Sequence, residues 1–214
     1  MSDASLKSIY VVMIAEATAR LLAAGRFLNA YHAGGSLPEL EASALQLRKA
    51  MEAIAYSAIA PDKKEYAALR AKVSGANGFT KDYHAKRIFA DLARINKDFY
   101  PYPVAPSQRQ PDGTHHFGNK TGPYLTKKRF EAMYDRLGKH LHAHNPWSGS
   151  KNVQNLAVDL PKAIEETHSL LDLHVRFIRT SRFNGAWLVE TPRTGQPPRI
   201  IEASAQGPFV RVGS

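Results

Sequence analysis

Apolar residues recur every three or four positions along most of this chain, which is the pattern of amphipathic helices that bury one face. The first stripe precedes Gly34 and Gly35, where a helix is expected to end. Its members are Leu6, Ile9, Tyr10, Met13, Ile14, Ala17, Leu21 and Leu22. A second helix is predicted to begin at Ser36, because Ser36 and Glu39 have the spacing of a capping box and Pro38 suits a first helical turn.

Three further helical stretches are predicted downstream. The second helix continues beyond Pro61, a third begins near Thr80, a fourth opens at Thr126, and the last carries Pro161 as a kink or a fresh start. The apolar stripes are Leu40, Ala44, Leu47, Met51, Ile54 and Ala55; Tyr83, Ile88, Phe89, Leu92 and Ile95; Phe130, Met133, Tyr134, Leu137 and Leu141; and Val153, Leu156, Leu160, Ile164, Leu170, Leu171, Leu173, His174, Phe177 and Ile178. The last helix is thus expected to reach residue 178.

Residues 99–123 interrupt this pattern with a long extended loop. Pro101, Pro103 and Pro106 remove backbone donors and restrict the residues before them, so a helix is excluded there. The aromatic residues at its start could stack on nucleic acid bases. The preferred interpretation is an extended strap whose aromatic side chains cover the apolar surface of the helices.

Alternating apolar residues near the C-terminus predict strands at residues 186–190, 199–203 and 209–212. So small a sheet has to pack on the helices to be stable. The fold class predicted is mainly α, an up-and-down helical bundle with a small C-terminal β-hairpin or three-stranded sheet. We expect a bundle domain over residues 1–182 and a strand appendage over residues 183–214.

Composition narrows the possible functions. The chain has 214 residues and no cysteine, which excludes disulfides, thiolate metal sites and cysteine nucleophiles. Its formal charge is +10, with 29 Lys and Arg against 19 Asp and Glu. Basic residues concentrate in residues 120–139 and 176–211, which favours contact with a polyanion such as RNA or DNA.

The N-terminal apolar run at residues 9–14 is interrupted by Glu16 and Arg20. It is too short for a membrane span, and no cleavage site frames it as a signal peptide. A cytoplasmic protein with no membrane association is therefore expected.

The candidate chemistry lies in residues 136–144, which hold one Arg, one Lys and three His beside an apolar stripe. On a continuous helix, Arg136, His140 and His144 would form one row. Metal-free RNA cleavage suits such a set, because an imidazole can exchange protons with ribose oxygens while a guanidinium pairs with the phosphate. The alternative is a metal hydrolase in which His140, His142 and His144 bind the ion with His115 or His116. It lacks a carboxylate partner nearby, so we expect no bound metal and no cofactor.

The segment resembles the motif of the HEPN superfamily, in which an Arg is followed four to six residues later by a His near the end of a helix. Arg136 and His142 have five residues between them. The resemblance implies a bundle of four or five helices, a homodimer in which two motifs meet, and a role in toxin–antitoxin or antiviral systems. It also implies that Arg136 binds the scissile phosphate and His142 acts as acid or base. Leu137, Gly138 and the C-terminal strands depart from the family pattern.

Other residues are assigned supporting roles around these two. The predicted supporting residues are Tyr134, Lys139, His140, His144 and Asn145, and the predicted nucleic-acid-binding residues are Lys127, Lys128, Arg129, Arg176 and Arg179. RNA is the expected ligand, with a homodimer and an antitoxin or other protein as expected partners. The alternative from another class is a non-catalytic basic module that binds a protein or nucleic acid.

Overall fold

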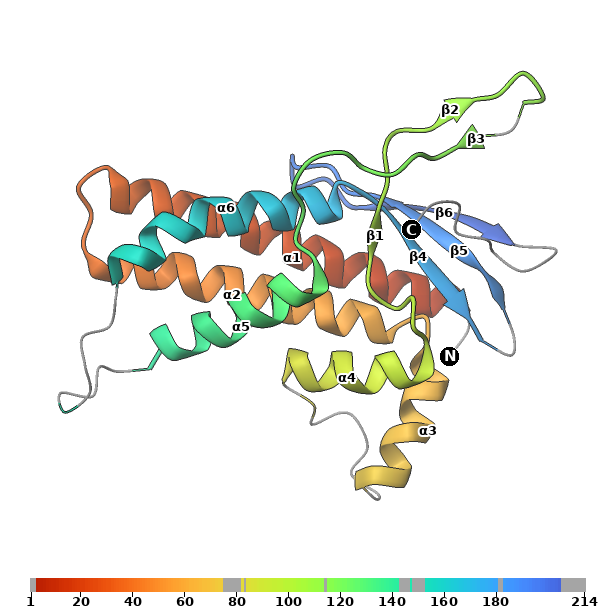
Figure 1. Cartoon of the computed structure of the whole chain (residues 1–214), viewed down its shortest axis with the longest axis horizontal. Coiled ribbons are helices and arrows are strands. Elements are labelled where there is room, and N and C mark those ends of the chain that lie inside the picture. The colour runs from red at the N-terminus through yellow and green to blue at the C-terminus, as the bar shows by residue number, and fades with distance from the viewer. Residues whose placement is uncertain are drawn as a thin grey trace.

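A computed structural model describes residues 3–74, 82, 84–113, 115–142, 147, 153–180 and 183–204, and six helices and six strands lie within them (Figure 1). The helices are α1 (Asp3–His32), α2 (Leu37–Ile59), α3 (Lys63–Ser74), α4 (Ala85–Ile95), α5 (Lys127–His140) and α6 (Val153–Leu171). The strands are β1 (Tyr102–Pro103), β2 (Gln108–Arg109), β3 (His115–His116), β4 (Leu173–Arg179), β5 (Asn184–Glu190) and β6 (Arg199–Ser204). The prediction of a mainly α fold with a C-terminal sheet is confirmed.

The hairpin of α1 and α2 is the centre of the fold. Tyr10 and Ile14 of α1 and Met51 of α2 are fully buried, as the apolar stripes predicted. The backbone turns between the helices at Gly34, whose φ of +98° suits glycine. The backbone amide of Ser36 donates to a Glu39 carboxylate oxygen at 2.9 Å, one half of the predicted capping box.

The two helices of this hairpin and two others, α5 and α6, alternate in direction along the chain. Figure 1 shows α1 and α5 running one way and α2 and α6 the other. α6 packs on α1 and α2, whereas α4 and α5 pack on α2. Pro161 lies inside α6, which continues through it. The candidate Thr80 cap and Tyr83 lie outside the described residues.

The sheet is antiparallel with the order β1-β4-β5-β6. Residues 173–178 were predicted to be helical, and this is wrong: they belong to β4, in which His174, Arg176 and Ile178 alternate inward. The apolar residues in this segment fit the periodicity of a helix and also that of a strand, and only the pairing with β5 shows that it is a strand. The predicted boundary at 182/183 falls between β4 and β5, which pair with each other. The predicted strand at 209–212 lies outside the described residues.

Residues 99–123 form the predicted strap, with short strands within it. The ring of Tyr100 packs edge-on against Phe89 of α4, with 5.7 Å between ring centroids, and Phe99 is buried beside it. β1 then adds to the sheet beside β4. β2 and β3 form a two-stranded arm that projects from the body of the protein (Figure 1).

Within the described residues, α1 is the one helix whose length and composition match those of a membrane span, over Ala4–His32. Core helices of water-soluble proteins have the same properties, and one face of α1 is buried against α2. The helix extends well beyond the apolar run at residues 9–14, and Glu16 and Arg20, which interrupt that run, pair with each other at 2.7 Å. The cytoplasmic location and the absence of a membrane stay predictions.

Arg176 makes a buried ion pair at the junction of sheet and helices. Its guanidinium contacts the Asp62 carboxylate at 2.6 Å, and both side chains are completely inaccessible to solvent. It also donates to the carbonyl oxygens of Asp98 at 2.9 Å and Ala58 at 3.2 Å. Asn96 donates to the Phe177 carbonyl at 3.0 Å. The prediction that Arg176 binds nucleic acid is therefore wrong, because its inward position in β4 keeps it from any ligand.

We expect Asp62→Ala to lower the free energy of unfolding by about 3–5 kcal/mol, since it leaves the Arg176 charge buried without a partner. In the double variant Asp62→Leu/Arg176→Met both charges are gone, so the loss should be smaller than in Asp62→Ala alone. Urea unfolding at neutral pH measures both values. A loss in the double variant as large as that in Asp62→Ala, or larger, would contradict this account.

A second buried group couples α1 to the sheet. The Leu171 carbonyl can only accept, so the 3.0 Å contact to His174 requires a proton on Nδ1. The Tyr10 hydroxyl then donates to Nε2 at 2.8 Å, and the imidazole is neutral. Burial lowers the pKa of His174 to about 4 from an ordinary value of 6.5.

Stability should therefore depend on pH through His174. Between pH 6.5 and 4 the unfolded chain binds a proton at His174 that the folded protein excludes, so the free energy of unfolding falls as pH falls, by up to about 3 kcal/mol. His174→Gln has no proton to take up and should show a shallower pH dependence over that window. Urea unfolding of both proteins across the window checks this, and equal slopes would refute it.

Candidate functional site

The candidate site lies on α5, which begins at Thr126. The Thr126 hydroxyl accepts a hydrogen bond from the Arg129 amide at 3.4 Å and so caps the first turn. Phe130, Tyr134 and Leu137 are buried, as their spacing predicted. Burial of this face directs Arg136 away from α2 and toward the neighbouring helix α6.

Arg136 lies against α6 and pairs with the carboxylate of Asp159. About a third of its side chain remains exposed. Arg136 and His140 border an open hollow of about 400 Å³, and α6 supplies Asn155, Val158 and Asp159 on the other side. The hollow therefore brings a guanidinium and an imidazole to one solvent-reached place.

The two helices set the spacing within this hollow. Arg136 and His140 are four residues apart on α5, and Asn155 and Asp159 are four residues apart on α6, so each pair lies on one face of its helix. Asp159 and Asn155 were missed by sequence reasoning. Their spacing was visible, but no local signal indicates that this face of α6 lies beside α5.

His142 takes a different position from His140. α5 ends at His140, so His142 lies beyond the helix, where it is exposed and does not border the hollow. The described residues thus combine Arg136 with His140 rather than with His142. His144 and Asn145 lie outside the described residues.

Tyr134 supports α5 from the buried side. Its hydroxyl donates to Glu52 at 2.9 Å, and the Arg48 guanidinium stacks over its ring at 3.9 Å from the centroid. Burial, with the Glu52 carboxylate beside it, raises the pKa of Tyr134 to about 12. Arg48 also donates to the Tyr134 carbonyl at 2.8 Å. Tyr134 is accordingly a packing residue that holds α5 on α2.

Gly138 leaves room on α5 for the Arg48 guanidinium. A Cβ on Gly138 would come within 2.7 Å of Arg48 Nη1, closer than such contacts allow. Glycine in a helix normally costs about 1 kcal/mol relative to alanine. A side chain at position 138 would therefore require the Arg48 guanidinium, which donates to the Tyr134 carbonyl, to move.

Most cations of the two basic stretches form ion pairs. The pairs among the described residues are Lys120 with Asp172, Lys127 with Glu131, Arg129 with Glu166, Arg136 with Asp159, Arg176 with Asp62, Arg179 with Asp98, and Arg193 with Glu165 and Asp172. Lys128 and Lys139 lie exposed on α5. The surface is therefore less strongly basic than a count of Lys and Arg in these stretches indicates.

The alternative prediction of a metal site, in which His115 or His116 binds an ion together with the histidines of residues 140–144, is wrong. His115 and His116 lie on β3 in the projecting arm, whereas α5 ends at the opposite side of the protein (Figure 1). The described part of the chain holds no group of three or more His, Cys, Asp or Glu side chains placed to bind an ion.

The chain matches no protein-family model, no curated protein and no solved structure in comparisons with known proteins. Arg136 offers a phosphate-binding cation, His140 an imidazole that can accept or donate a proton, and Asn155 a polar neighbour. This combination suits a phosphodiester.

A substitution at Gly138 tests the packing behind the site. In an Arg48→Ala background, Gly138→Ala should raise the free energy of unfolding by about 1 kcal/mol through helix propensity. In the wild type that gain should be cancelled or reversed, because the new Cβ displaces the Arg48 guanidinium. Urea unfolding of the four proteins gives the coupling between the two sites. The same effect in both backgrounds would show that Arg48 and Gly138 do not interact.

Proposed function

We propose that this protein binds RNA at the hollow between α5 and α6 and cleaves it without a metal ion. The observation that carries the proposal is the shared hollow of Arg136 and His140, where one phosphodiester can reach both side chains. Lys139, exposed on α5, adds positive charge next to it. The alternating directions of α1, α2, α5 and α6 are compatible with the HEPN-like bundle. With that resemblance we also propose a homodimer and a toxin–antitoxin or antiviral setting.

The proposed reaction is an internal transesterification. The His140 imidazole accepts the proton of the ribose 2′-hydroxyl, and the 2′-oxygen forms a bond to phosphorus. The bond from phosphorus to the 5′-oxygen breaks, and the departing oxygen takes a proton from a second imidazole. His142 is the candidate for this role, and the reaction requires it to turn from its position beyond the end of α5 toward the hollow. Arg136 stabilises the added negative charge on the phosphate oxygens. The products are a 2′,3′-cyclic phosphate and a 5′-hydroxyl.

Asp159 competes with RNA in this reaction. Arg136 is paired with Asp159, so RNA has to compete with that carboxylate for the guanidinium. The same observation favours a second candidate function, a non-catalytic module in which the α5–α6 face binds nucleic acid or a protein partner. Catalysis distinguishes the two candidates.

Opposite substitutions at this pair test RNA binding. Arg136→Ala should weaken the affinity for single-stranded RNA about tenfold, because it removes a charge-assisted contact to phosphate. Asp159→Asn should strengthen it, because the competing charge is gone. Fluorescence polarisation with labelled RNA at low ionic strength measures both. Arg20→Ala is the matched control, since Arg20 is likewise paired on a helix surface but lies on α1. Equal affinities for all four proteins would exclude this hollow as the RNA site.

Cleavage is tested separately with the same RNA in excess EDTA. Wild type should produce cyclic-phosphate ends, and His140→Ala and His142→Ala should each lose most of the activity while retaining RNA affinity. Binding without cleavage by the wild type would favour the non-catalytic module. Cleavage that depends on His142 but not on His140 would favour Arg136 and His142 as the catalytic residues, as the sequence predicted.

A further inference from the structure

α1 is mostly apolar around its whole circumference, but only one of its sides is buried. Within the most apolar 18-residue window of this helix, 33% of the residues are buried. The buried side carries Tyr10, Ile14 and Leu21 and packs on α2, α6 and β6. A helix that is hydrophobic all round is normally buried all round. The outer side of α1 is therefore a candidate surface for contact with another molecule.

The outer side of α1 has a stripe of apolar and small residues of its own, spaced by three, four or seven positions. They are Ser8, Val12, Ala15, Ala19, Ala23 and Ala30. Val12 is 55% exposed, and Phe27 at the border of the stripe is 38% exposed. Spacing by three and four along one face is the pattern by which two helices pack on each other, and small side chains let their axes come close.

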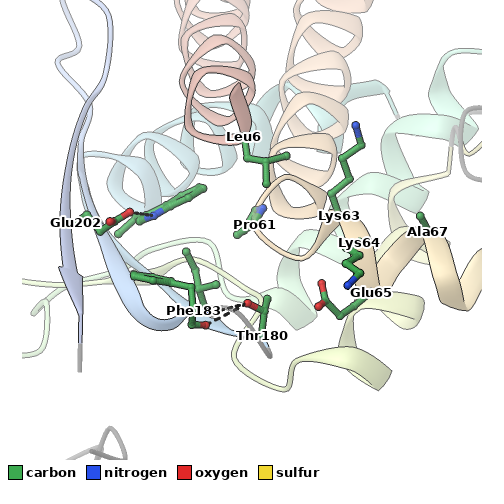
Figure 2. A pocket seen from close by; sticks show the side chains of 11 residues that line it. Leu6, Pro61, Lys63, Lys64, Glu65, Ala67, Thr180, Phe183 and Glu202 are labelled. Atoms are coloured by element: carbon green, nitrogen blue, oxygen red, sulfur yellow. Dashed lines mark hydrogen bonds between the residues drawn. The ribbon is translucent and has the colours of Figure 1, made fainter. Parts of the chain in front are cut away.

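The first turn of α1 lies outside this stripe. Leu6 points into a cavity of about 310 Å³ between α3 and the sheet, beside Pro61 and Phe183 (Figure 2). The charged residues that line this cavity are Lys63, Lys64, Glu65 and Glu202, and their charges balance. Because Leu6 and Ser8 are two residues apart on a helix, their side chains point in nearly opposite directions. The cavity and the outer stripe are thus separate surfaces.

The charges along α1 favour a second copy of the chain in the antiparallel orientation. Glu16 and Arg20 pair with each other on the flank of the stripe, and Glu16 is 44% exposed. Antiparallel packing about Ala19 places Arg26 of each copy beside the partner's Val12. This position is one turn from the partner's Glu16, so the two opposite charges attract. Parallel packing would instead bring the two Arg26 side chains together.

The size of this face suits a weak, reversible dimer. Residues 8–30 extend over about 33 Å at 1.5 Å per residue, and a helix is about 10 Å wide. The footprint of roughly 330 Å² per copy is smaller than the ~800 Å² that a standard interface buries on each partner. A dissociation constant in the micromolar range is therefore expected.

A lipid surface fits this face less well than a second copy does. Helices that lie on membranes carry Lys and Arg beside their apolar face. Along residues 8–23 the charged residues are Glu16 and Arg20, which neutralise each other. This stretch therefore has no net charge with which to attract an anionic membrane.

We propose that two copies of this chain associate through the outer face of α1, antiparallel and with Ala19 next to the two-fold axis. Val12 and Phe27 of each copy then leave the solvent, which favours association. The interface contains neither Arg136 nor His140, so the proposed RNA hollow is not part of it. The inference gives the homodimer proposed above a defined surface, and it rests on α1 rather than on RNA chemistry.

Sedimentation velocity over about 1–200 µM protein tests the association. Wild type should show a reversible equilibrium between monomer and dimer. Val12→Arg should raise the dissociation constant about tenfold or more, because the new charge lies beside the partner's Arg26. Val73→Arg is the matched control, since Val73 is also 55% exposed but lies on α3. A wild type that stays monomeric over the whole range, or equal dimerisation of wild type and Val12→Arg, would overturn the proposal.

Single cysteines determine the orientation, because the chain has none of its own. Under mild oxidation Ala19→Cys should form a disulfide-linked dimer, and Val73→Cys should not. Ser8→Cys mixed with Ala30→Cys should give the mixed dimer, because antiparallel packing brings these positions together. Efficient linking of Ala30→Cys to itself would indicate parallel packing and contradict the proposal.

Vesicles of phosphatidylcholine and phosphatidylglycerol test the lipid alternative in co-sedimentation. Wild type and Val12→Arg should both stay in the supernatant. Vesicle binding by a wild type that is monomeric in solution, lost in Val12→Arg, would show that the outer face of α1 contacts lipid and would exclude the second copy. None of these measurements uses RNA, so their failure would leave the proposed function of the α5–α6 hollow untouched.

Discussion

Arg176 and Asp62 bring two charges into a region that water does not reach, and the arrangement of sheet on helices depends on their contact. Burial lowers the pKa of Arg176 and raises that of Asp62, because desolvation disfavours the charged form of each. Their pairing and the hydrogen bonds around them offset that cost. Because a guanidinium needs several acceptors in fixed directions, the pair also sets where β4 lies relative to the turn between α2 and α3.

Other buried contacts also join the sheet to the helices. Tyr10 and His174 connect α1 to β4, and Trp187 packs edge-on against Tyr10 with 5.6 Å between ring centroids. β1 of the strap extends the sheet on the outer side of β4. Strands that are widely separated along the chain thereby become one layer, and the cavity beside α3 arises where this layer meets the helices.

The ion pair on the α5–α6 face differs from the buried Arg176–Asp62 pair, because its two side chains are partly exposed to water. Arg136 is oriented by Asp159, and such a contact is weak enough to be exchanged for a phosphate. Behind it, the contact of Arg48 with Tyr134 and Gly138 holds α5 against α2. A rigid helix with an exchangeable surface pair is a suitable base for ligand binding, because binding does not require the core to move.

The sequence by itself determined the local elements. Apolar spacing located the helices around Tyr10, Met51 and Phe130, and alternation located β5 and β6, because periodicity reports which side of an element is apolar. Only the tertiary structure decided that Arg176 is buried, that residues 173–178 form a strand and that Asp159 pairs with Arg136. Arg176 and Asp62 are 114 positions apart in the sequence. Local patterns carry no information on which distant partner a side chain meets, and that partner determines whether an arginine holds the fold together or remains available to a ligand.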